Sequence, residues 1–219
     1  MYLFILSRMR KYVISALFVL FLGGYALGQD YQIGIKVAPT LSNSRTSAES
    51  SGTSLQRDGS AVKFLLGAFV DIPFKANYYF SGGVNFASKV TKLTLNTQTT
   101  SLAEEYDHEF LQIPLLLKLY TNEVTLDTKV FFNFGVVPEI RLNSSTESDT
   151  GLIINDFQDF DLAGNFGAGV ERGIGVNTRV FAALNYNIGF INMVATQVST
   201  FGDIAVKSNL FTLEFVIKF

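Results

Sequence analysis

Apolar and polar residues alternate with a period of two along most of this chain, and segment 129–142 shows the pattern most clearly. Because successive side chains of a β-strand point to opposite faces, this alternation predicts a strand with one apolar face. One face would carry Val130, Phe132, Phe134, Val136, Pro138, Ile140 and Leu142, and the other Lys129, Phe131, Asn133, Gly135, Val137, Glu139 and Arg141. After Gln29 no stretch of helical length shows the spacing of an amphipathic helix, so we expect an all-β domain.

The same alternation recurs in eight segments. The predicted strands are 31–41, 63–72, 78–89, 110–120, 129–142, 160–171, 179–190 and 211–219. Each reaches the ~9–11 residues that a tilted membrane-spanning strand needs, and their number is even. The predicted connections 43–60, 94–104, 143–159 and 192–206 are long, whereas 73–77, 121–128 and 172–177 are short. Long and short connections alternate in bacterial outer-membrane barrels, so the sequence predicts an eight-stranded, antiparallel, up-and-down transmembrane β-barrel in the outer membrane.

The bulk of the two faces predicts which one points outward. An eight-stranded bore is only just wide enough to be filled by side chains, so the Phe, Leu, Ile and Tyr residues of every strand would not fit inside. The other face is rich in Gly, Ala, Ser, Thr and Asn and suits a narrow interior. A soluble eight-stranded barrel, such as a lipocalin, shows the same alternation and remains the alternative.

The inward face also carries charges of both signs. Charges shut away from water are costly unless they are paired, so we expect these side chains to neutralise one another along the lumen. This predicted lumen network consists of Lys36, Lys63, Asp71, Lys118, Glu139, Arg141, Glu171, Arg179, Glu214 and Lys218.

The first 28 residues have the layout of a cleaved secretory signal peptide. Arg8, Arg10 and Lys11 precede an apolar run at 12–22, and the small residues Ala26 and Gly28 stand at the expected cleavage site. The alternative is a membrane anchor, but the run is short for the ~20 residues of a spanning helix. The expected domains are therefore a signal peptide at 1–28 and an outer-membrane β-barrel at 29–219.

Composition excludes several classes of function. The chain has no Cys and one His, which argues against a disulfide framework, a thiolate metal site or a cysteine nucleophile. It has 17 basic and 19 acidic residues, so the basic excess that a nucleic-acid partner requires is absent. No cofactor and no metal is expected.

Two segments resemble a known family. Residues 110–118, Phe-Leu-Gln-Ile-Pro-Leu-Leu-Leu-Lys, and residues 34–42, Gly-Ile-Lys-Val-Ala-Pro-Thr-Leu-Ser, are similar to strands of the PorT-like outer-membrane β-barrel family of diderm bacteria. Gln112 stands where that family usually has Glu. The resemblance covers the expected mature chain and implies location and fold, and some members take part in type IX protein secretion.

The last strand looks like the signal by which barrel-assembly machinery recognises its clients. That signal would consist of Phe211, Leu213, Phe215, Ile217 and Phe219. The implied partners are membrane lipid, the assembly machinery during insertion and a protein that contacts the long loops.

Three functions are compared. We expect a non-enzymatic scaffold or interaction protein, linked to secretion or to cell-surface contacts. The first alternative is a narrow passive pore, although paired charges in so narrow a bore argue against free diffusion. The second is a lipid-modifying enzyme, in which His108, flanked by Asp107 and Glu109, would act as general base for Ser101 or Ser88.

Pro114 lies within a predicted strand. Proline has no N–H to donate to a neighbouring strand, so we expect a bulge or a local break there.

Overall fold

The computed structural model describes residues 31–49, 54–57, 60–96, 101–146, 154–197 and 203–219. The predicted signal peptide, 1–28, lies outside these residues. Among the described residues, no helix has the length and apolar character needed to cross a membrane.

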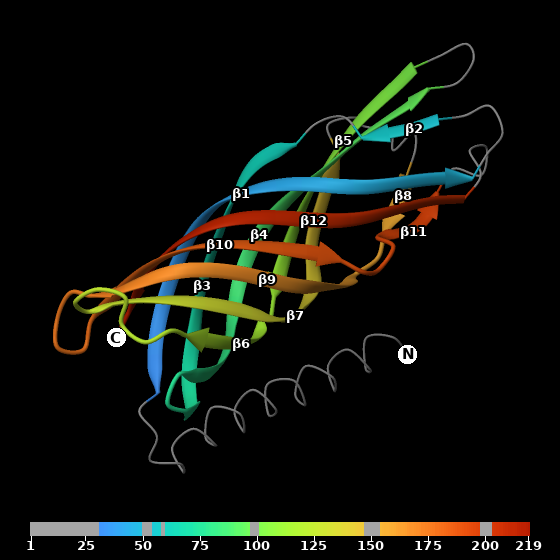
Figure 1. Ribbon diagram of the computed structural model, residues 1–219. Coiled ribbons are helices and arrows are strands. Elements are labelled where there is room, and N and C mark those ends of the chain that lie inside the picture. Colours follow the sequence, from blue (N-terminus) through green and yellow to red (C-terminus); the bar gives the residue numbers. More distant parts are fainter. Residues whose placement is uncertain (1–30, 50–53, 58–59, 97–100, 147–153, 198–202) are drawn as a thin grey trace, which may run out of the picture. The chain divides into compact units, whose positions relative to one another are not determined.

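The described part of the chain is an antiparallel β-barrel whose wall is a ring of eight strands (Figure 1). In ring order the wall consists of β1 (Gln32–Glu49), β3 (Ala61–Lys75), β4 (Tyr78–Asn96), β5 (Ser101–Gln112) continued by β6 (Leu115–Tyr120), β7 (Thr128–Thr146), β9 (Phe160–Gly173), β10 (Arg179–Gly189) and β12 (Asp203–Lys218). Each strand pairs with the next one, and β12 pairs with β1 from Gly34 opposite Lys218 to Glu49 opposite Asp203. The predicted all-β, eight-stranded meander is confirmed.

Pro114 divides the fourth wall strand into β5 and β6 without shifting its register. Against β4, Asn85 is opposite Gln112 and Gly82 is opposite Leu115, so both chains advance by the same number of residues across the break. The expected bulge or local break at Pro114 is thus a local break between β5 and β6. The pairing of this wall strand with β7 shifts register nearer the long-loop end, between Glu109 and Phe110.

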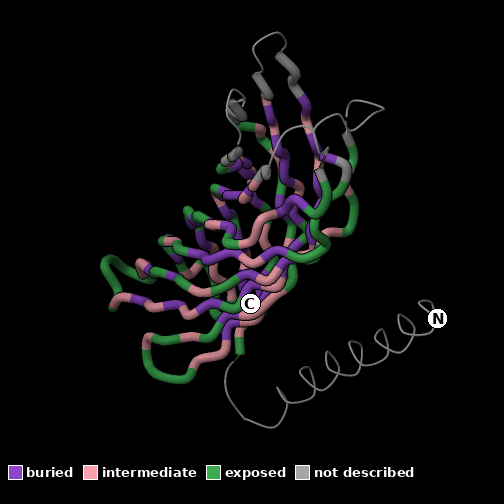
Figure 2. Tube along the Cα trace, turned by 90° about the vertical axis from the view of Figure 1, so that its right-hand side faces the viewer, coloured by how far each residue is buried: buried purple, intermediate pink, exposed green. Residues whose placement is uncertain are grey.

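The strands turn their bulky residues outward, as the alternation predicts. Ile35, Phe64, Phe132, Phe166 and Phe215 are each about half exposed or more, and the inward positions that alternate with them are buried or of intermediate exposure. Figure 2 shows buried positions alternating with intermediate or exposed ones along the strands. The outside of the barrel is therefore an apolar band, and the inside is lined by small, polar and charged side chains.

The two ends of the barrel differ in the length of their connections. Short turns join β3 to β4, β6 to β7 and β9 to β10, and β1 begins and β12 ends at this same end. At the other end the strands are longer than predicted, since β4 reaches Asn96 and β5 begins at Ser101, inside the predicted loop 94–104. Beyond the apolar band the outward residues are polar, for example Lys92 and Glu105. The strands therefore continue there without the apolar–polar alternation from which they were predicted.

Three short strands lie at this long-loop end. β2 (Ser54–Arg57) pairs with β4, and β8 (Ile154–Phe157) pairs with β11 (Val194–Gln197) in a separate two-stranded sheet. Side chains of the β8–β11 sheet and of the residue before β11 form one buried apolar cluster with the barrel wall. Its members are Leu93, Tyr106, Phe110, Ile154, Phe157, Met193, Val194 and Val206.

Candidate functional site

The lumen at the short-turn end contains a cluster of buried ion pairs. Lys118 donates hydrogen bonds to both carboxylate oxygens of Asp71, at 2.9 and 3.0 Å. Lys218 lies 2.6 Å from Glu171 and 3.6 Å from Asp71, so it joins the two carboxylates into one cluster. All four side chains are at most 5% exposed. Their mutual neutralisation compensates for the loss of water around each charge.

Aromatic residues complete this cluster. Tyr120 donates a 2.7 Å hydrogen bond to Glu171 and accepts one of 3.2 Å from Lys218. The ammonium of Lys118 lies 4.2 Å from the ring centre of Phe69 and 5.1 Å from that of Phe181, distances typical of cation–π contacts. We call this set, made of Phe69, Asp71, Lys118, Tyr120, Phe131, Glu171, Phe181 and Lys218, the lower plug.

The lower plug crosses the bore from wall to wall. Lys218 belongs to β12 and Tyr120 to β6, which lie four places apart in a ring of eight strands and therefore face each other across the barrel. Phe69 of β3 and Phe181 of β10 lie three places apart, and their ring centres are 5.9 Å from each other. These contacts leave the lumen occupied by side chains at this level.

The structure brings some of the other predicted network residues together and leaves others at the rims. Lys36 and Glu214 form a part-buried pair at 2.8 Å. Lys63 pairs with Asp107, outside the predicted set, and both are about one-third exposed. Arg179 lies 3.3 Å from Glu171 but is 39% exposed at the short-turn rim.

Arg141 lies at the opposite rim and holds β8. It pairs with Asp156 and Asp159, at 3.3 and 2.8 Å, and donates to the carbonyl of Phe157. Its contacts fix the end of the β8–β11 sheet against β7. Arg141 was predicted to belong to a network along the lumen. Its partners in the structure instead lie at the rim.

The predicted network omits Lys89 and Asp161, which are buried near Glu139. Glu139 pairs with Lys89, and it also accepts a 2.9 Å hydrogen bond from Gln112. Asp161 is buried nearby, and its Oδ1 accepts the backbone N–H of Leu162. Lys89 and Asp161 both fall on the inward side of the alternation, so the pattern itself was the signal that could have identified them.

Between the charged clusters lies a row of neutral polar side chains. Asn133 is opposite Gly167, Gly167 is opposite Asn185, and Asn185, Thr212 and Thr40 follow across neighbouring strands. Asn133 and Asn185 extend over Gly167, where an added Cβ would overlap their amide oxygens. Within the described ranges, both of these oxygens and the hydroxyls of Thr40 and Thr212 lack a protein hydrogen-bond partner. Buried polar atoms of this kind are ordinarily satisfied by internal water.

His108 is placed differently from the enzyme hypothesis. Its Nδ1 lies 3.0 Å from the hydroxyl of Ser144. The enzyme hypothesis had named Ser88 or Ser101 as its partner. The imidazole is fully buried, with the ring centre of Phe157 4.4 Å away, and its Nε2 has no hydrogen-bond partner in the described part of the chain. Phe157 of β8 therefore packs over this imidazole and helps to bury it.

No acidic or histidine cluster suited to a metal ion occurs among the residues that the structure describes. The described side chains of the lumen include paired charges, aromatic rings and amides.

Comparison with known proteins identifies the architecture. A family model described as an outer membrane protein beta-barrel domain matches residues 27–195. The crystal structure of the outer membrane protein OprG from Pseudomonas aeruginosa is similar, with a TM-score of 0.58 and 14% sequence identity over 87% of this chain and 97% of that chain. Neisserial surface protein A, NspA, gives a TM-score of 0.50 and 10% identity over 86% of this chain and 95% of that one. No curated protein matches the sequence.

Proposed function

The chain belongs to the outer membrane protein beta-barrel domain family, and from this premise we propose that it is a closed scaffold that holds protein partners at the outer membrane. It is a multi-pass protein of that membrane. The short turns of bacterial barrels face the periplasm, so the lower plug lies at the periplasmic end and β8 and β11 at the cell surface.

The lower plug is the observation that carries the proposal. A passive pore needs an open aqueous path, whereas here Lys218 of β12 reaches Tyr120 on the opposite wall at 3.2 Å. Opening this level would separate Lys118 and Lys218 from Asp71 and Glu171, at the energetic cost of exposing buried, unpaired charges. The plug therefore favours a scaffold over a pore.

Recording in planar lipid bilayers tests the closed barrel. We expect no reproducible unitary conductance from the wild-type protein. The double variant Tyr120→Ala/Phe131→Ala, which hollows the lower plug, should conduct, whereas Phe132→Ala, on the outward face of the same strand as Phe131, should not. Reproducible unitary conductance of the wild type would contradict the scaffold and support the pore.

The PorT-like resemblance supports a more specific role at a secretion complex. The connections at the cell-surface end are the longer ones in the sequence, and a protein partner would bind there. Affinity isolation of the tagged barrel from gently solubilised outer membrane should recover that partner. A variant lacking the connection 147–153 should recover less of that partner than the full chain does. Equal recovery by the two would place the contact elsewhere.

The proposed scaffold performs no reaction. His108 lies beneath Phe157 and next to Ser144, with no carboxylate hydrogen-bonded to the imidazole among the described residues. Replacing His108 with Ala should therefore leave the lipid composition of the outer membrane unchanged, and an altered composition would revive the enzyme hypothesis.

A further inference from the structure

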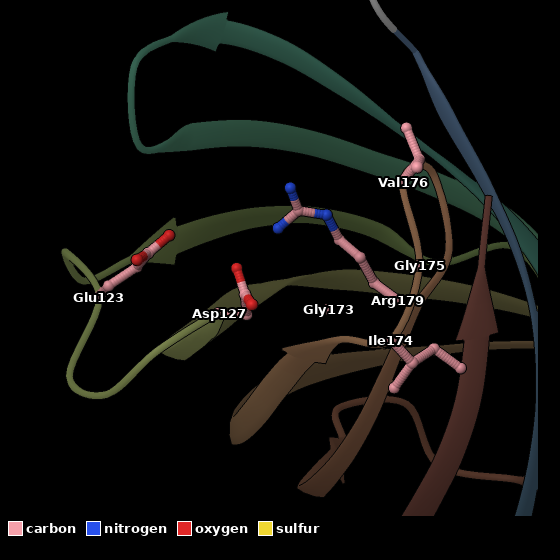
Figure 3. A pocket seen from close by; sticks show the side chains of 7 residues that line it. All are labelled: Glu123, Asp127, Gly173, Ile174, Gly175, Val176 and Arg179. Atoms are coloured by element: carbon pink, nitrogen blue, oxygen red, sulfur yellow. The ribbon is translucent and has the colours of Figure 1, made fainter.

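A pocket of about 410 Å³ opens between two neighbouring turns at the periplasmic end. The turn that joins β6 to β7 contributes Glu123 and Asp127, and the segment from β9 to β10 contributes Ile174, Val176 and Arg179. Figure 3 shows Arg179 extending into this space, with Glu123 and Asp127 on the opposite wall. The volume lies within the range of small-ligand sites, about 300–1,000 Å³.

Backbone hydrogen bonds form the pocket in advance of any ligand. The N–H of Gly173 donates to the carbonyl of Asp127 at 2.9 Å, which ties the two turns together. Within the turns, Val124 donates to Thr128 at 2.9 Å and Ile174 to Thr178 at 3.0 Å. Asp127 has a φ of 56°, in the left-handed region that Asp tolerates better than most residues.

Opposite charges face each other across the pocket without neutralising each other. Arg179 pairs with Glu171, which lies outside the pocket lining, at 3.3 Å through one of its nitrogens. In the described part of the chain, neither Glu123 nor Asp127 takes part in an ion pair. The guanidinium has five N–H groups, so donors remain for a further carboxylate.

Aliphatic side chains border the charges. Ile174 is 59% exposed and Val176 is fully exposed, and both line the pocket. An apolar group that covered them would remove this surface from water.

We propose that this pocket binds a short free peptide of the periplasm. The ammonium of the peptide would lie against Glu123 and Asp127, its carboxylate against Arg179, and an aliphatic side chain against Ile174 and Val176. The arrangement supplies both charged contacts and the apolar contact at once, which neither a simple anion nor a simple cation would use. The site is independent of the proposed scaffold function, because it lies at the short-turn rim and requires neither a closed lumen nor a partner at the cell surface.

Titration calorimetry with the full-length folded barrel in detergent tests the proposal, with alanyl-leucyl-alanine as the probe. Blocking the amino end by acetylation or the carboxyl end by amidation should weaken binding about tenfold each, the effect of losing one charge-assisted hydrogen bond. Replacing the central leucine with glycine should also weaken binding. Failure of the free peptide to bind at millimolar concentration, or equal binding of all four peptides, would overturn the proposal.

Variants locate the site. Glu123→Gln and Asp127→Asn should weaken the free peptide about tenfold but add no further loss for the acetylated peptide, because the same contact is removed twice. Arg179→Gln should behave in the same way toward the amidated peptide. Glu109→Gln, at the other end of the barrel, is the control and should bind like the wild type.

Arg179→Gln also removes a contact of Glu171, so its folding must be checked by the heat-dependent mobility of the barrel on a gel. Glu123 lies on an exposed turn outside the strands, and Glu123→Gln therefore keeps the test decisive if Arg179→Gln folds poorly. Loss of affinity in Arg179→Gln alone, with Glu123→Gln and Asp127→Asn unchanged, would indicate a simple anion site and overturn the peptide proposal.

Discussion

Lys118 and Asp71 form a buried ion pair in which the ammonium donates to both carboxylate oxygens, at 2.9 and 3.0 Å. They belong to β6 and β3, with β4 between them, so the pair spans the lumen side of three wall strands. Asp71 thus pairs with both lysines of the lower plug, Lys118 and Lys218.

Lys118→Met tests the contribution of this pair to stability. The change leaves Asp71 buried with Lys218 as its remaining cation, and breaking a buried pair on one side costs about 3–5 kcal/mol. Urea unfolding in detergent should show that loss, whereas Lys63→Met, which breaks the part-exposed pair with Asp107, should cost about 1 kcal/mol or less. Adding Asp71→Asn to Lys118→Met should restore part of the loss.

Glu139→Ala should lower the melting temperature because it leaves Lys89 buried without its carboxylate. It also removes the acceptor of Gln112. Glu109→Ala, an exposed carboxylate of β5, is the control and should melt close to the wild type. Equal melting of all three proteins would refute the role of the Lys89–Glu139 pair.

Gly135→Ala should impair folding, because the added Cβ would overlap the carbonyl of Leu115 and lie 2.8 Å from the Cα of Leu116. Backbone atoms of a neighbouring strand cannot move away easily, and overpacking of this kind costs about 1–3 kcal/mol. At Gly82 nothing lies within 4 Å of the added Cβ, so Gly82→Ala should be neutral or stabilising by up to ~1 kcal/mol. Refolding yield and urea unfolding measure both variants.

Phe134→Lys tests the outward orientation of the apolar band. A lysine facing the middle of the bilayer destabilises a barrel by about 2–4 kcal/mol. Leu126→Lys, on a turn where the side chain is 84% exposed, should have little effect. Unfolding in lipid vesicles compares the two, and equal stability would mean that Phe134 does not contact lipid.

Phe219→Ser tests the predicted assembly signal. The backbone of Phe219 exchanges hydrogen bonds with Ile33, at 2.8 and 3.1 Å, and these bonds do not depend on its side chain. We therefore expect normal refolding in detergent but reduced insertion into the outer membrane in cells. Phe190→Ser, another outward aromatic residue, is the matched control. Normal insertion of Phe219→Ser would show that the terminal side chain carries no signal.

The alternation of side chains predicts the wall of this barrel because lipid on one side and a narrow bore on the other impose it on every spanning strand. Residues such as Phe132 and Asn133 are placed correctly by that pattern alone. Beyond the lipid this constraint ends, so the extension of β4 and β5 and the β8–β11 sheet were expected to be loops.

The contacts within the lumen were harder to predict. Alternation places Lys89 and Glu139 inside, but their pairing depends on the registers of β4, β5 and β7, which single segments do not specify. Likewise, the partner of His108 is Ser144 because the two residues lie opposite each other on β5 and β7. In the pocket at the short-turn end, Arg179 begins β10 and was expected in the lumen network. Glu123 and Asp127 lie on a turn, where no periodic pattern marks them.

The pairing of β12 with β1 links the order of synthesis to the completion of the wall. The edge of the earliest strand stays without its neighbour until the final strand arrives, and inside a bilayer no water could satisfy its peptide groups. A chain interrupted before β12 would therefore expose unpaired strand edges that are prone to aggregation, and it would not close into a smaller barrel. Quality control in the periplasm would then have two unpaired strand edges to recognise, those of β1 and β10.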